Sequence, residues 1–156
     1  MNDQQYMQLA LKMARESMDN QKGGPFGCII VKDHQIIGRG TNEVTSSNDP
    51  TAHAEIVAIR DACKHLNNFQ LEGCTIYTTC EPCPMCLGAI YWSRPAHIIF
   101  AGSREDAAAA GFDDSMIYRE LTMPLAERKI PTTSIERDSA IELFNAWIQK
   151  ENKILY

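Results

Sequence analysis

Two short stretches are the most informative part of the sequence: residues 53–55 read His-Ala-Glu, and residues 80–86 read Cys-Glu-Pro-Cys-Pro-Met-Cys. The prolines of the second stretch favour a helix that opens at position 82 or 84. Residues three apart at a helix start share one face, so the thiols of Cys83 and Cys86 can bind one ion. The positive end of the helix dipole favours the thiolate form that a metal requires. His53 adds a neutral nitrogen ligand from the start of another helix.

One histidine and two thiolates predict a catalytic zinc site, with one Zn²⁺ per subunit and water as the fourth ligand. Zinc lowers the pKa of bound water from ~15.7 towards ~7, so that hydroxide becomes available at neutral pH. Glu55 is the candidate for moving the water proton. Because mid-helix residues two apart face nearly opposite ways, this assignment requires His53 and Glu55 to lie in the first turn of their helix.

The six cysteines permit other interpretations. A disulfide framework is one, although no secretory signal accompanies it. An iron–sulfur run would need a cysteine four positions after Cys86, where the chain has Ile90. A Cys-x-x-Cys redox pair would leave the histidine and glutamate of residues 53–55 unexplained. A structural zinc site with Cys80 as fourth ligand remains open. We interpret Cys80 as a packed core residue, together with Cys28, Cys63 and Cys74.

Composition narrows the class of protein. The chain has 156 residues, of which 44% are hydrophobic and 22% charged, and this is typical of one compact domain covering 1–156. The net charge is −5 and the basic residues do not cluster, which favours a small neutral substrate over nucleic acid. The sequence has neither a signal peptide nor an apolar run of ~20 residues. We therefore expect a cytoplasmic protein without membrane contact.

Helical and strand patterns alternate along the chain, which predicts an α/β fold with three layers: a central mixed sheet covered by helices on both faces. The first two strands should pair antiparallel and the later ones parallel. Strands are expected at 28–31, 36–37, 74–79, 97–101 and 132–136. Helices are expected at 6–18, from an N-cap at Thr51 to 65, from 82 or 84 to 91, and at 104–110, 115–121 and 139–152.

The His-x-Glu and Pro-Cys-x-x-Cys motifs resemble those of the cytidine deaminase superfamily, and the similarity extends from about Gly24 to Gly102. The resemblance implies a sheet of five strands and a zinc-dependent hydrolytic deaminase. Its substrate would be a nucleobase or nucleoside, and the superfamily alone does not choose among them.

Three further stretches resemble the bacterial guanine deaminases of this superfamily along essentially the whole chain. They are Gly-Gly-Pro-Phe-Gly at 23–27 with Asn42 downstream, Gly-Phe-Asp-Asp at 111–114, and Ile-Leu-Tyr at 154–156. This resemblance implies hydrolysis of guanine to xanthine and ammonia. Plant guanosine deaminases share the second stretch and a similar tail, so guanosine or cytosine remains an alternative substrate. A binding module with structural zinc and no activity is the alternative from another class.

The resemblance also implies roles for single residues. Asp114 would accept hydrogen bonds from the ring N–H and the exocyclic amine of guanine, and is a candidate to protonate the leaving amine. The pocket would otherwise be formed by Phe26, Asn42, Ala54, Trp92 and Tyr156. Phe26 would stack on the purine and Asn42 would bind a polar ring edge. Taken without the resemblance, Phe26 and Trp92 also fit core positions, and Asn42 and Asp114 fit turns.

The end of the chain is unusually apolar for a free terminus. In the guanine deaminases that the chain resembles, the C-terminal segment is exchanged between subunits and its tyrosine closes the pocket of the partner. We therefore expect a homodimer in which about residues 139–156 are exchanged.

Overall fold

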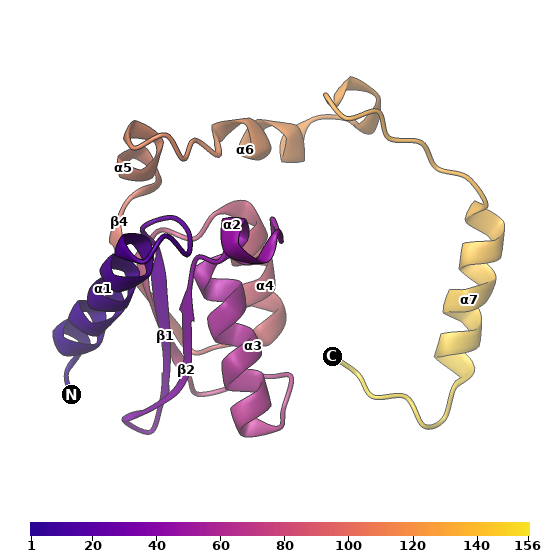
Figure 1. Ribbon diagram of the computed structural model, residues 1–156. Helices are drawn as coiled ribbons and strands as arrows, with labels where there is room; N and C mark the ends of the chain where they lie inside the picture. The colour runs from indigo at the N-terminus through magenta and orange to yellow at the C-terminus, as the bar shows by residue number, and fades with distance from the viewer. The chain divides into compact units, whose positions relative to one another are not determined.

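The computed structural model describes residues 1–156 and divides into two units, 1–114 and 115–156 (Figure 1). The first unit contains one sheet with the strand order β2-β1-β3-β4. Its strands are β1 (Gly27–Lys32), β2 (Gln35–Thr41), β3 (Thr75–Cys80) and β4 (His97–Gly102). The first unit thus has the predicted α/β class, with four strands in its sheet.

The sheet is mixed, as the sequence predicts. β1 and β2 form an antiparallel hairpin. Its turn residues Asp33 and His34 both have positive φ, 47° and 63°, which matches the right-handed twist of the two strands. β3 pairs antiparallel with β1 and parallel with β4. The parallel arrangement expected for the later strands is therefore confined to β3 and β4.

Helices cover both faces of this sheet, which confirms the three layers. On one face, α1 (Asp3–Asp19) packs Tyr6 and Ala10 against Ile29 of β1. On the other face, α3 (Ala54–Leu66) and α4 (Pro84–Ser93) pack against Ile30 and Ile76. β1 reads as an unbroken apolar run because its side chains are buried on both faces.

Small residues bring α3 unusually close to β2. Ala54, Ala58 and Ala62 are fully buried along one side of the helix. They face Gly38 and Gly40, and a Cβ at Gly40 would overlap the carbonyl oxygen of Ala54. This close approach fixes the N-terminal end of α3 against the sheet, and that end carries residues 53–55.

The start of α3 differs from the expectation that Thr51 is the N-cap. The helix begins at Ala54, and His53 is the N-cap with extended backbone angles, φ −70° and ψ 156°. The Thr51 N–H and hydroxyl both donate to Asp49 Oδ1, at 2.8 Å and 2.7 Å, so Thr51 belongs to the turn that precedes the helix. Upstream, the polar loop expected at 41–50 contains the short helix α2 (Val44–Ser47).

α5 (Arg104–Ala109) follows β4 and completes the first unit. The second unit consists of α6 (Ser115–Thr122), the 3₁₀ turn η1 (Leu125–Glu127) and α7 (Arg137–Gln149). The strand predicted at 132–136 is absent, because β-prone residues form a strand only where a neighbouring strand pairs with their backbone, and this segment has no such pairing. The predicted fifth strand was therefore wrong for this structure. None of the helices has both the length and the apolar character needed to cross a bilayer.

Candidate metal centre and substrate site

The N-termini of α3 and α4 carry the candidate metal ligands. His53 is the N-cap of α3, and Cys83 is the N-cap of α4. Pro84 occupies the first position of α4, where its missing N–H costs no hydrogen bond, and Cys86 therefore lies in the first turn. Both helices direct the positive ends of their dipoles at the three ligand atoms, which favours thiolates.

The distances among these atoms fit a tetrahedral zinc site. His53 Nδ1 lies 3.6 Å from Cys83 Sγ and 3.5 Å from Cys86 Sγ. With Zn–S near 2.3 Å and Zn–N near 2.0–2.1 Å, tetrahedral geometry places nitrogen and sulfur ligands about 3.6 Å apart. His53, Cys83 and Cys86 form the one group of such side chains able to hold an ion, with all ligand atoms within 4.8 Å of one another. The donor set therefore suits zinc.

The electrostatics of the two thiols also suit a metal. The Cys86 thiol donates to Cys83, and this contact, together with the hydrogen bond to His53, lowers the pKa of Cys83 to about 4. The hydrogen bond to Cys83, together with burial, raises the pKa of Cys86. The hydrogen bond to Cys83 raises the pKa of His53. These contacts favour the thiolate form of Cys83, and a metal requires the thiolate form of both cysteines.

Cys80 does not belong to this group of ligands. Its thiol contacts the carbonyl oxygen of Ser103 at 3.7 Å, and burial raises its pKa to about 11. All six cysteines are free thiols, so the structure contains no disulfide framework. These observations favour three protein ligands over a closed, structural four-ligand site.

Glu55 lies in the first turn of α3, two residues after the N-cap, and only 6% of its surface is exposed. The first-turn position meets the condition for placing a metal ligand and a proton carrier on the same end of a helix. Burial raises the pKa of Glu55, and the negative charge of Cys83 contributes to the increase. A hydrogen bond of 3.2 Å joins its Oε1 to the Thr78 hydroxyl. Glu55 is therefore close to the metal ligands, and one oxygen of its carboxylate is held by Thr78.

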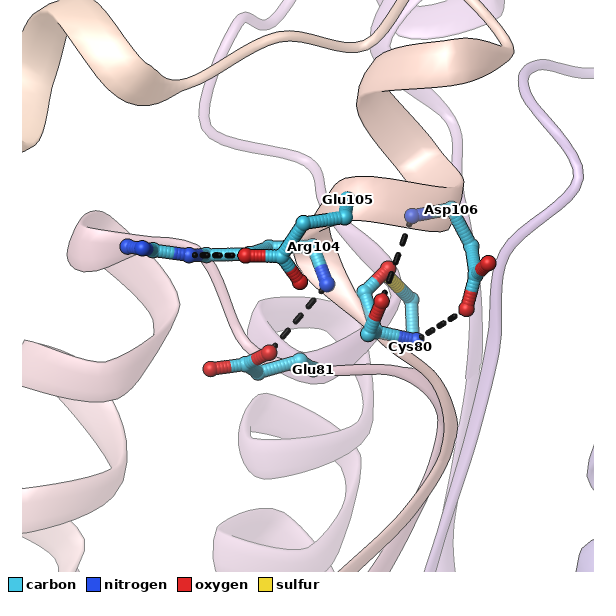
Figure 2. Close-up of polar contacts among 6 residues, drawn as sticks. Cys80, Glu81, Arg104, Glu105 and Asp106 are labelled. Atoms are coloured by element: carbon cyan, nitrogen blue, oxygen red, sulfur yellow. Dashed lines mark hydrogen bonds and ion pairs between the residues drawn. The ribbon is translucent and has the colours of Figure 1, made fainter.

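Hydrogen bonds of Glu81 join the segment 80–83 to the end of β4 (Figure 2). The Glu81 N–H donates to the Gly102 carbonyl oxygen at 2.8 Å, and Glu81 Oε2 accepts from the Arg104 N–H at 3.1 Å. Ser103 and Asp106 cap α5 reciprocally, each accepting from the backbone N–H of the other. These hydrogen bonds fix the start of α5, and the chain continues from the end of α5 into residues 111–114.

The last residue of the stretch 111–114, Asp114, interacts electrostatically with the metal ligand Cys83. Asp114 is partly exposed, and its pKa is raised by burial and then by the negative charge of Cys83. The ring of Phe112 meets the ring of Phe26 edge to face, with centroids 4.8 Å apart. Phe26 is thus paired with the Gly-Phe-Asp-Asp stretch while its other contacts lie in the core.

Asn42 has a fixed amide orientation. It is 8% exposed, and its Oδ1 accepts from the backbone N–H groups of Gly24 at 3.2 Å and Val44 at 3.3 Å. Gly23 packs so closely that a Cβ there would overlap both the carbonyl oxygen and Oδ1 of Asn42. Because Oδ1 is committed to the backbone, the NH₂ group is the part of Asn42 that can bind another molecule.

Three other expected pocket residues have different environments. The side chain of Ala54 is fully buried in the core. Its backbone N–H, at the first position of α3, is therefore the group that could bind a substrate. Trp92 lies on α4 and is 66% exposed, which rules out full burial in the core. Tyr156 belongs to the second unit and is 69% exposed.

Sequence reasoning missed three contacts of this site, made by Thr78, Glu81 and Phe112. Thr78 lies in a β-branched stretch that is typical of a buried strand, and no spacing rule connects it with Glu55. Glu81 stands inside the cysteine motif, where its polar side chain among prolines and cysteines was the only available signal. Phe112 is part of the Gly-Phe-Asp-Asp stretch. Its ring contact with Phe26, 86 residues earlier in the sequence, could not be predicted from the spacing of residues.

The fold and the metal centre together define a zinc-binding deaminase. Residues 1–102 match the family of the cytidine and deoxycytidylate deaminase zinc-binding region, and the chain belongs to this family. The predicted superfamily, enzyme class and metal are therefore confirmed.

Within the family, the chain is similar to guanine deaminase from Bacillus subtilis, with 51% identity over 156 residues and the full length of both chains. The crystal structure of guanine deaminase from Bacillus subtilis matches with a TM-score of 0.97, covering 100% of this chain and 99% of that one. A tRNA-specific adenosine deaminase from Aquifex aeolicus is 35% identical over 96% of both chains. The predicted resemblance to bacterial guanine deaminases is confirmed.

Proposed function

We propose that this chain hydrolyses guanine to xanthine and ammonia. The position of Asp114 carries the proposal, because this carboxylate ends the Gly-Phe-Asp-Asp stretch within electrostatic reach of the metal ligand Cys83. Guanine presents a ring N–H beside its exocyclic amine, and a single carboxylate can accept from both. Full-length similarity to a guanine deaminase supports the same substrate.

The pocket residues would orient the base. Phe26 would stack on the purine face, and Phe112 would support it through their edge-to-face contact. The NH₂ group of Asn42 would donate to an acceptor on the ring edge opposite the amine, where guanine carries its carbonyl oxygen and an unprotonated ring nitrogen. A base bound in this orientation would present C2 to the metal centre.

His53, Cys83 and Cys86 would hold the zinc ion, which would supply an acidified water at neutral pH. Glu55 would take a proton from the attacking water and deliver it to ring N3 as the water oxygen bonds to C2. Backbone N–H groups at the start of α4 stabilise the charge that develops at the tetrahedral carbon. Glu55, with Asp114, then delivers the second water proton to the amine. The C2–N bond breaks, ammonia leaves, and C2 retains a carbonyl oxygen.

A panel of bases and nucleosides tests the substrate. We expect the zinc-loaded protein to release ammonia from guanine in preference to guanosine, cytosine, cytidine and adenine. Asp114→Asn should lower kcat/KM for guanine by about 10- to 100-fold, because one charge-assisted acceptor is lost, and should leave zinc content unchanged. Asp113→Asn is the matched control and should retain activity. Preferred turnover of guanosine or cytosine would keep the zinc chemistry but contradict the assigned substrate.

We further propose that the chain forms a homodimer in which the C-terminal segment, about residues 139–156, is exchanged. None of residues 115–156 is buried, so the second unit has no core of its own. In α7, Leu143 is 72% exposed and Phe144 is 67% exposed. In the first unit, Phe100 of β4 is also exposed. Apolar surfaces of this kind are typical of subunit interfaces, and exchange between identical chains covers them.

Removing residues 153–156 tests the role of the exchanged tail. The truncated protein should lose about tenfold or more in guanine turnover, since a closing aromatic ring and its hydroxyl contribute about 1–2 kcal/mol. Zinc content should not change. The molar mass from light scattering should be that of a dimer for the wild type and for the control Glu151→Ala. A monomeric wild type, or undiminished turnover after truncation, would contradict the exchange.

A further inference from the structure

Thr78 makes a contact to Glu55 that the reaction described above does not use. Its side chain is 1% exposed, and its hydroxyl donates to Glu55 Oε1 at 3.2 Å. Thr78 lies in β3 between two neighbours, paired with Cys28 on β1 and with Phe100 on β4. A donor on the central part of a sheet has little freedom to move. The hydroxyl therefore holds one oxygen of the Glu55 carboxylate at a defined place.

The neighbouring threonine shows that a buried hydroxyl on this strand can serve a purely structural purpose. Thr79 Oγ1 accepts from the backbone N–H of Gly27 at 3.1 Å and so holds the first residue of β1. Thr78, by contrast, bonds to the end of a flexible side chain from another element. Its hydrogen bond orients a carboxylate rather than a strand.

We propose that Thr78 is a positioning residue that fixes the Glu55 carboxylate for proton transfer. This inference rests on the proton-carrying role of Glu55 in the proposed function. With Oε1 held by Thr78, the other carboxylate oxygen is the one that takes and returns protons. A group that transfers a proton more than once in each turnover needs the same orientation at every step, and a fixed donor supplies it.

Thr78→Val separates the hydroxyl from the packing, because valine keeps the branched shape and the strand preference. In the zinc-loaded, full-length enzyme, this change should lower kcat by about 10- to 100-fold and change KM by less than about twofold. Thr78→Ser restores the hydroxyl and should recover most of the activity. Thr75→Val, on the same strand, is the control and should behave as the wild type.

Two further measurements make the test specific. When Glu55 is already Gln, adding Thr78→Val should lower the residual rate by less than about twofold, because both changes remove the same function. A crystal structure of zinc-loaded Thr78→Val should show the Glu55 carboxylate turned away from its wild-type position, with the three ligands unchanged. This structural readout does not depend on the substrate.

The outcomes separate this inference from the proposed function. Kinetics are measured on whichever base of the panel the wild type turns over, so an error about guanine does not affect the test. Undiminished kcat in Thr78→Val, no rescue by serine, or an unmoved Glu55 carboxylate would overturn the positioning role. Full activity of Glu55→Gln would overturn both the proton-carrying role and the inference that depends on it.

Discussion

Replacing Glu55 by Gln is expected to lower kcat by at least about 10²- to 10⁴-fold while zinc remains bound. Glutamine has nearly the same shape and can still accept from the Thr78 hydroxyl, but its amide cannot take a proton from water. Because Glu55 acts more than once in the proposed reaction, several steps slow together. The metal ligands are unchanged, so the substitution removes proton transfer without removing the metal.

The measurement combines turnover with metal content. Ammonia release under saturating guanine gives kcat, and elemental analysis gives the zinc content of the same sample. Glu16→Gln is the control, since Glu16 is an exposed residue of α1. A Glu55→Gln enzyme with near-normal turnover would remove Glu55 from the reaction. A variant that has lost its zinc would show instead that Glu55 supports the metal site.

The part of the site that depends on spacing within one helix start could be predicted from sequence. Cys83 and Cys86 are three residues apart beside Pro84, and this local pattern fixes a helix start and a shared ligand face. The sequence did not show whether His53 and Glu55 lie at the same end of a helix. It predicted only that Glu55 could serve the metal site if both residues lay in the first turn. This condition holds because His53 is the N-cap, which turns the backbone so that both residues lie at the end of the helix.

The parts that depend on distant or competing partners could not be predicted. Thr51 has the right chemistry for an N-cap, but it forms a turn with Asp49, and His53, two residues later, is the N-cap of the helix. Residues 132–136 have strand-forming side chains, yet a strand exists only with a paired neighbour, and the sequence does not show where one lies. The bond from Thr78 to Glu55 joins two elements 23 residues apart, and its geometry arises from tertiary packing.

Removing a metal ligand should have an even larger effect than removing the proton carrier. In Cys83→Ala the His53 and Cys86 side chains remain, but two ligands hold zinc far more weakly than three. We expect the purified variant to contain almost no zinc and to release no measurable ammonia from guanine. Chelation of the wild type should give the same loss, and added zinc should restore activity to the chelated wild type only.

Cys80→Ala is the matched control, since Cys80 lies three residues before Cys83 and its thiol contacts the Ser103 carbonyl instead of the ligands. This variant should keep one zinc per chain and most of its turnover, with at most a modest loss of stability from the smaller side chain. Loss of zinc from Cys80→Ala would make Cys80 a fourth ligand. The centre would then be closed to water, and a structural zinc site would replace the catalytic one, because hydrolysis requires an open position on the metal.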